Sequence, residues 1–219
     1  MDRAPEAPPG RSRLTGAIHS RWPPLVAALA IAAVYLVIPD QLMIGPSWLP
    51  LAVVVAGLVP IGAAQLRGHH RVARTFALGL TAALSVLVAL SVLFLVTTLP
   101  RGTTQAGPLL VYATLIWLAN TGVFALWYWE VDCGGPAARH VAYSCTDFAF
   151  PQLVVGGEAA EGWHPHFLDY LFLAFNTSTA FSPTDTMVLS HRAKALMMAQ
   201  SLISLVVIAF LAARAVNTL

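Results

Sequence analysis

The chain has 219 residues, of which 58% are hydrophobic and only 10% are charged, against about 25% charged residues in an ordinary globular domain. So few charges cannot cover a water-soluble surface, and several uncharged runs exceed the ~20 residues with which a helix crosses a bilayer. Composition therefore predicts an all-α, polytopic helical membrane protein. A net charge of only +2, with the basic residues near the predicted membrane ends, argues against nucleic-acid binding.

Five firm transmembrane helices are predicted from the uncharged runs, and Gly45-Pro46-Ser47 breaks the first long run into a helical hairpin. Residues 1–23 are expected to form an N-terminal tail, 24–107 a three-helix membrane region, and 108–219 a region that resembles a pore domain. The final helix, 195–216, contains the uncharged run 195–213. The five predicted spans are, in chain order, residues 24–44, 48–66, 75–100, 108–130 and 195–216.

A shorter element lies between the fourth and fifth spans. Tyr170–Thr184 is a stretch of 15 uncharged residues rich in hydroxyl groups, and at ~1.5 Å per residue it falls short of a ~30 Å hydrocarbon core. We expect a short helix over 166–181, followed by a turn over 181–186. This element is either re-entrant, like a pore helix, or a short sixth crossing.

Arginine placement predicts the orientation. The positive-inside rule assigns a cytoplasmic N-terminus in a bacterial inner membrane, and it leaves loop 131–165 on the cytoplasmic side. The C-terminus is then outside if the short element is re-entrant and inside if it crosses. The arginines that support this orientation precede the first span or lie in the second loop: Arg3, Arg11, Arg13, Arg21, Arg67, Arg71 and Arg74.

Two cysteines, Cys133 and Cys145, share loop 131–165 with His140 between them. On the cytoplasmic side they are expected to stay reduced, whereas outside they would form a disulfide. The spacing C-x6-H-x4-C lacks the short paired spacings of structural zinc motifs. We therefore expect no metal site and no cofactor.

No enzymatic motif is present. The chain lacks Gly-x-Ser-x-Gly, His-Glu-x-x-His, Cys-x-x-Cys and a phosphate-binding glycine loop. Glu130 and Asp132 end the fourth span, and with Arg139 they suggest a loop clamp of interfacial ion pairs. We therefore expect no catalytic residues.

The hydroxyl-rich stretch is the main candidate site. Non-helical backbone at membrane depth is tolerated only where protein or a water-filled cavity satisfies its polar groups. The alternative is a structural helix whose Ser and Thr side chains bond back to its own carbonyls or join neighbouring helices. Asp169 lies at the start of this element as a pore-helix acid. The residues expected to line the route are Asn176, Thr177, Ser178, Thr179, Phe181, Ser182, Pro183, Thr184 and Asp185.

The last helix carries Gln200, Ser201 and Ser204 on neighbouring turns. These residues are candidates for lining an oligomer axis. Small polar residues on a transmembrane helix also mediate ordinary helix packing, and both interpretations stay open.

The segment from Phe167 to Asn217 resembles the pore helix, filter and inner helix of two-transmembrane potassium-type channels. In both, an aromatic-rich short helix leads to a threonine-rich corner, an aspartate and one long apolar helix. This resemblance implies a homo-oligomer, a tetramer if it is channel-like, with inorganic cations as the permeant. The chain lacks the glycine filter, since no glycine follows Gly162 and Phe181, Ser182 and Pro183 stand in its place. Weakly selective cation passage is therefore expected.

About the last hundred residues also resemble a group of uncharacterised, chiefly actinobacterial, polytopic membrane proteins. The similar motifs begin with Tyr-Trp-Glu-x-Asp-x-Gly-Gly-Pro, matched here by Tyr128–Pro136, and include Phe-Pro-Gln, matched by Phe150–Gln152. Ala180–Thr186 and Ala213–Asn217 match two further motifs of the group. The group has no established activity, so this resemblance implies no function.

The sequence is compatible with three functions. The first is an oligomeric, weakly selective cation channel in the lipid bilayer. The second is a non-conducting membrane scaffold or accessory protein. The third, a small-solute transporter, is weaker because no repeat relates the two halves of the chain.

Overall fold

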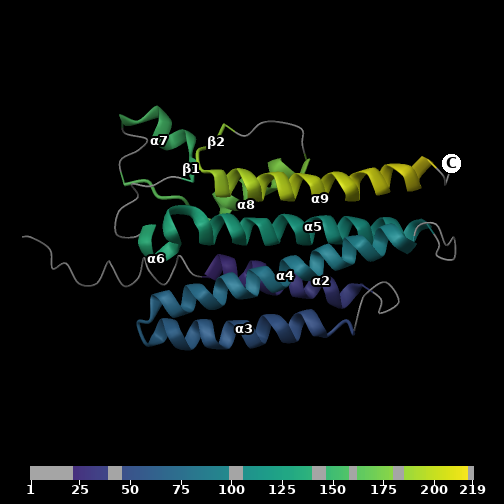
Figure 1. The fold of residues 1–219 in the computed structure, drawn as a ribbon, viewed down its shortest axis with the longest axis horizontal. Helices are drawn as coiled ribbons and strands as arrows, with labels where there is room; N and C mark the ends of the chain where they lie inside the picture. The colour runs from purple at the N-terminus through teal and green to yellow at the C-terminus, as the bar shows by residue number, and fades with distance from the viewer. Residues whose placement is uncertain are drawn as a thin grey trace, which may run out of the picture.

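The computed structural model describes residues 22–38, 46–98, 106–139, 147–157, 162–179 and 185–216. This part of the chain is mostly helical, and its long helices run roughly side by side (Figure 1). The elements are α2 (Trp22–Val37), α3 (Leu49–Leu66), α4 (His70–Thr98), α5 (Ala106–Val131), η3 (Asp132–Gly134), α6 (Pro136–Arg139), β1 (Phe148–Ala149), α7 (Pro151–Val155), α8 (Phe167–Thr179), β2 (Met187–Val188) and α9 (His191–Val216).

Four helices, α3, α4, α5 and α9, are long and apolar enough to cross a membrane. These apolar helices confirm the prediction of a helical membrane protein. Helix α2 is apolar but has 16 residues, about 24 Å at 1.5 Å per residue, so of the five predicted spans four reach full length among the described residues. Of the predicted break Gly45-Pro46-Ser47, Gly45 lies outside the described residues, whereas Pro46 and Ser47 precede the start of α3 at Leu49.

Helix α5 is the central helix of the molecule. In the most apolar stretch of α5, 61% of the residues are buried, whereas in the corresponding stretches of α3 and α9 only 22% are buried. Helix α5 packs against α2, α4, α8 and α9, while α3 packs on α2 and α4. Close approach explains one of its small residues, because a Cβ on Gly122 would come within 3.0 Å of the Ile31 side chain on α2. Helix α5 therefore contacts four of the other helices.

Two helices begin earlier than the uncharged runs predict. Helix α4 begins at His70 rather than at residue 75, and α9 begins at His191 rather than at residue 195. The extra turns carry basic residues, which end an uncharged run in the sequence without ending the helix. The start of α9 is capped by Ser190, whose Oγ accepts the backbone N–H of Ala193 at 3.1 Å.

The predicted loop 131–165 contains secondary structure of its own. It holds η3, α6, β1 and α7, and β1 pairs antiparallel with β2 in the register Phe148↔Val188 and Ala149↔Met187. This pairing joins the loop to the segment just before α9. Gly135, with φ +96°, lies where a Cβ would approach Arg74 Nε to 2.9 Å, so only glycine fits between α4 and this loop.

Candidate functional site

Helix α8, predicted over 166–181, ends half-way along its two neighbours, α5 and α9. Its 13 residues rise about 20 Å, short of a ~30 Å hydrocarbon core. Trp117, near the middle of α5, donates from Nε1 to the carbonyl oxygen of Ser178 near the C-terminal end of α8, at 3.3 Å. The start of α8 lies beside the start of α9 (Figure 1). The C-terminal end of α8 is therefore at the mid-depth of the bundle.

Gln200 of α9 holds that end of α8 in place. Its side chain is fully buried, and its Nε2 donates to the carbonyl oxygen of Ala174 at 2.7 Å and to Ser178 Oγ at 2.7 Å. Its Oε1 accepts the hydroxyl of Tyr128 on α5. One amide thus connects all three helices in an apolar interior, where each satisfied polar group avoids a desolvation penalty.

Further polar side chains extend this contact. Asn120 Nδ2 donates to Ser204 Oγ at 3.0 Å, and Thr121 Oγ1 donates to Ser178 Oγ at 3.0 Å. These side chains are all nearly or fully buried. We call the set the Gln200 network; its members are Asn120, Thr121, Tyr128, Ser178, Gln200 and Ser204.

The predicted pore hydroxyls of α8 divide into two kinds. Ser178 is buried in the Gln200 network. Thr177 and Thr179 are half-buried, and their hydroxyls donate to the carbonyl oxygens of Leu173 at 2.8 Å and Asn176 at 3.0 Å. Such bonds satisfy the hydroxyls within their own helix. The predicted turn residues outside the described part of the chain are Phe181, Ser182, Pro183 and Thr184.

The two predicted acids at the ends of this element have different surroundings. Asp169 Oδ2 accepts the backbone N–H of His166 at 2.7 Å, and the backbone N–H of Asp169 donates to the carbonyl of His166 at 3.0 Å. Asp169 therefore acts as a cap of α8, as a carboxylate in the first helical turn commonly does. Asp185 is exposed and precedes β2.

An ion pair secures the segment that leads into α9. Arg192 donates from Nε and Nη2 to the two carboxylate oxygens of Asp147, at 2.6 and 2.5 Å. The same carboxylate accepts the backbone N–H of Cys133 at 3.3 Å. Burial alone would raise the pKa of Asp147, but the hydrogen bonds from Arg192 and Ser190, with the arginine charge, hold it below its usual range. The sequence analysis did not single out this pair, because its members lie 45 positions apart and no spacing rule joins them.

Arg139 forms a clamp that differs in part from the predicted one. Its Nη1 donates to the backbone carbonyls of Trp129 at 2.6 Å and Asp132 at 2.9 Å, and its guanidinium lies 4.3 Å above the Trp129 ring and 5.1 Å above the Tyr170 ring. The Asp132 carboxylate accepts the Tyr170 hydroxyl. The predicted clamp of Arg139 with Glu130 and Asp132 thus works through backbone oxygens and aromatic faces, and it ties the end of α5 to the start of α8.

Cys133 is buried at the end of α5, whereas Cys145 and His140 lie outside the described residues. Among residues that the structure describes, no group of three or more His, Cys, Asp or Glu side chains is arranged to hold a metal ion.

No protein-family model, no curated protein and no solved structure matches this chain. The geometry of the chain itself therefore carries the functional assignment.

Proposed function

We propose that the protein is a subunit of a homo-oligomeric membrane channel that passes small cations with weak selectivity. In this proposal α2, α3, α4, α5 and α9 cross the membrane, and α8 is a re-entrant half-helix. Two observations support the re-entrant path. Helix α8 ends at mid-depth, and residues 187–188 pair with β1 of loop 131–165, which brings the chain back to the end at which α8 begins.

The position of the C-terminal end of α8 is the observation that carries the proposal. A helix C-terminus has a partial negative charge and carbonyl groups that favour a nearby cation, and half-helices that end at mid-depth build ion sites in this way. Asn176, Thr177 and Thr179 add half-buried polar oxygens at the same end. Ser182, Thr184 and Asp185 follow in the sequence, so oxygen ligands and one acid accompany the return of the chain.

The Gln200 network then acts as the anchor of the half-helix rather than as the lining of the route. Gln200, Ser204 and Ser178 all bond to partners in the same subunit. Ser201, on the same helix, is half-buried. Three residues of the last helix were predicted to line the pore. Of these, only Ser201 remains on the proposed ion route.

One half-helix cannot enclose a symmetric pore, so the proposal requires several subunits. Helix α8 carries three exposed apolar side chains, Leu168, Phe172 and Phe175, which are 70%, 63% and 46% exposed. Phe175 also packs edge-on against Trp117 of α5, at 5.7 Å between ring centroids. A neighbouring subunit offers cover for these side chains, and a tetramer is the arrangement that the channel resemblance implies.

Ion flux into liposomes that hold the purified protein tests the proposal. We expect potassium and sodium to pass, chloride to be excluded, and Asp185→Asn to lower cation flux, because the variant removes the charge beside the return segment. Glu158→Gln, which removes one negative charge from loop 131–165 instead, is the matched control and should leave flux unchanged. Equal flux from wild type and a folded Asp185→Asn oligomer would remove the role of Asp185.

A non-conducting scaffold is the second candidate. The closed hydrogen bonding of Ser178 and Gln200 within one subunit favours it, because these polar groups then need no water-filled route. The same liposomes decide between the two candidates. Absence of cation flux from protein that is folded and oligomeric supports the scaffold, whose exposed α8 face would then contact a partner.

A further inference from the structure

An apolar groove continues the path of α8 beyond the point where that helix ends. Helices α5 and α9 run on side by side past this end (Figure 1), and the groove has a volume of about 280 Å³. Its lining residues are Thr114 and Trp117 of α5, Thr179 of α8, and Ile208 and Leu211 of α9. The last residue of α8 thus closes the groove at the mid-depth of the bundle.

The lining residues lie on the same helix faces that hold α8. On α5, Trp117 donates to the carbonyl oxygen of Ser178 in α8, and Thr114 lies three residues away on the same face. On α9, Gln200 donates to α8, and Ile208 lies eight residues further along the same stripe. The groove is therefore the part of the α5–α9 surface that a longer α8 would cover.

The three polar side chains in the lining use their hydrogen-bonding groups within the protein. They donate to backbone carbonyl oxygens at 2.9 to 3.3 Å: Thr114 to Leu110, Trp117 to Ser178 and Thr179 to Asn176. Ile208 and Leu211 complete the lining with aliphatic groups. Water needs two to four polar partners to occupy a buried space. Walls of this kind therefore favour an apolar occupant.

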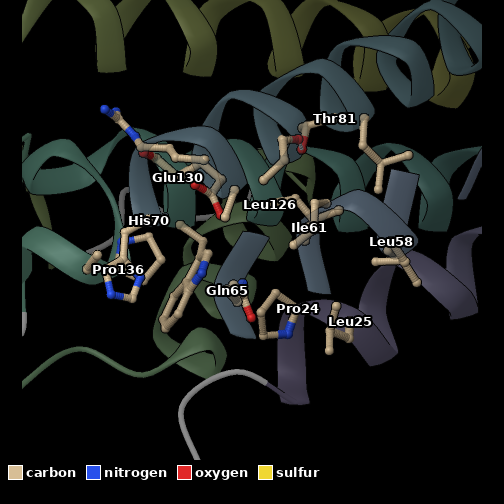
Figure 2. A pocket seen from close by; sticks show the side chains of 17 residues that line it. Pro24, Leu25, Leu58, Ile61, Gln65, His70, Thr81, Leu126, Glu130 and Pro136 are labelled. Carbon is tan, nitrogen blue, oxygen red and sulfur yellow. Dashed lines mark hydrogen bonds between the residues drawn. The ribbon is translucent and has the colours of Figure 1, made fainter. Parts of the chain in front are cut away.

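The cavity shown in Figure 2 has a different character. It has a volume of about 110 Å³ and lies among α2, α3, α4 and α5, with Gln65 and Glu130 in its wall. Arg74 also lines it, and among the described residues Glu130 Oε2 and Arg74 Nε are buried without a hydrogen-bond partner. A hydrocarbon chain placed against such groups would leave them unsatisfied, which is costly. An apolar occupant therefore fits the groove beyond α8 and not this cavity.

We propose that the groove binds one acyl chain of a membrane lipid, which enters from the bilayer surface at which α9 ends. Thr179 closes the groove at mid-depth, so the chain has its entrance on the side of Leu211. The surroundings at this depth are hydrocarbon, and an unfilled groove would lose van der Waals contacts along its walls. The bound chain supports the end of α8. The site does not depend on ion passage, because its five lining residues belong to one subunit.

The size of the groove selects a chain rather than a helix of a second copy. One turn of helix with its side chains, about 10 Å across and 5.4 Å high, fills about 400 Å³, which is more than the 280 Å³ of the groove. A cavity of roughly 150 Å³ holds a benzene molecule, so the groove has room for a run of several methylene groups. A helix of a neighbouring subunit would lie over the groove and not in it.

Photolabelling in vesicles tests the proposal. The purified protein is reconstituted in phosphatidylcholine that includes a small fraction of phosphatidylcholine with a diazirine at the end of one acyl chain. Mass spectrometry of fragments then locates the label. We expect more label at the closed end of the groove, at Trp117 and Thr179, than at Leu202. Leu202 is exposed near the middle of α9 and does not line the groove, so it reports contact with bulk lipid at a similar depth.

Two variants fill the groove from opposite walls, Ile208→Trp from α9 and Thr114→Phe from α5. Each should remove most of the label at the closed end of the groove, because the larger side chain takes the place of the acyl chain. Leu205→Trp, at an exposed residue of α9 outside the lining, is the matched control and should label as wild type does.

Three results would overturn the proposal. Label of equal strength at Leu202 and at the closed end of the groove would indicate bulk lipid only. No label at the closed end in the folded wild type would show that protein covers the groove instead. Unchanged label at the closed end in both folded groove variants would show that the labelling lipid does not occupy the groove.

Discussion

Replacing Gln200 with methionine tests whether the Gln200 network holds α8 at mid-depth. Methionine has nearly the same length and flexibility as glutamine but no amide, so packing is kept while three side-chain hydrogen bonds are lost. Hydrogen bonds between transmembrane helices contribute about 0.6 kcal/mol each on average. Three of them therefore predict a loss of about 2 kcal/mol in the free energy of unfolding.

The loss is measured by unfolding in mixed micelles with increasing denaturing detergent. Met198→Leu is the matched control, because Met198 lies on the same helix and is 67% exposed; its free energy of unfolding should change by less than about 0.5 kcal/mol. If Gln200→Met is as stable as this control, the network does not anchor α8, and the structural role assigned to Gln200 is wrong.

A double-mutant cycle with Ser178→Ala assigns part of that loss to one contact. Gln200 Nε2 donates to Ser178 Oγ at 2.7 Å, so the two changes should be non-additive. The expected coupling is about 0.6 kcal/mol, with an upper bound of about 1.7 kcal/mol. Strictly additive effects would show that the two side chains contribute to stability through different partners.

Two further variants test the ends of the helices. Because the fold lowers the pKa of Asp147 below its unfolded value of 3.8, this carboxylate stabilises the fold above that pH, and the stabilisation is lost as pH falls through the lower, folded pKa. Arg192→Gln should reduce stability at neutral pH and make the loss of stability below about pH 4 shallower, as acid titration of the unfolding midpoint would reveal. Gly135→Ala should cost about 1–3 kcal/mol, since its Cβ would meet Arg74 at φ +96°; an unchanged midpoint in thermal unfolding would contradict this.

The long helices follow from the sequence because uncharged runs report burial in lipid directly. The ends of α4 and α9 do not, because Arg71 and Arg192 lie on helical turns beyond the apolar runs. A charge marks where the hydrocarbon ends, whereas a helix ends where its backbone groups find other partners. Ser190, which caps α9, was a usable signal for the true start of that helix.

The candidate site was predictable only in part. The hydroxyls of α8 and the polar residues of α9 stand out in an apolar sequence, but Asn120 and Tyr128 lie in α5 without any pattern that links them to Gln200. Their convergence depends on the depth at which α8 stops, which is a tertiary property. The bonds of Gln200 and Ser204 within one subunit agree with the packing interpretation of these residues.

A helix that stops inside the bilayer is costly unless protein groups satisfy its last carbonyls. Trp117 of α5 serves this purpose by donating to the carbonyl oxygen of Ser178, and Thr179 donates from its own hydroxyl to the carbonyl oxygen of Asn176. A continuous apolar helix would satisfy its own backbone at this depth without such partners. In the proposed channel, the interrupted path supplies polar backbone and hydroxyl groups at mid-depth.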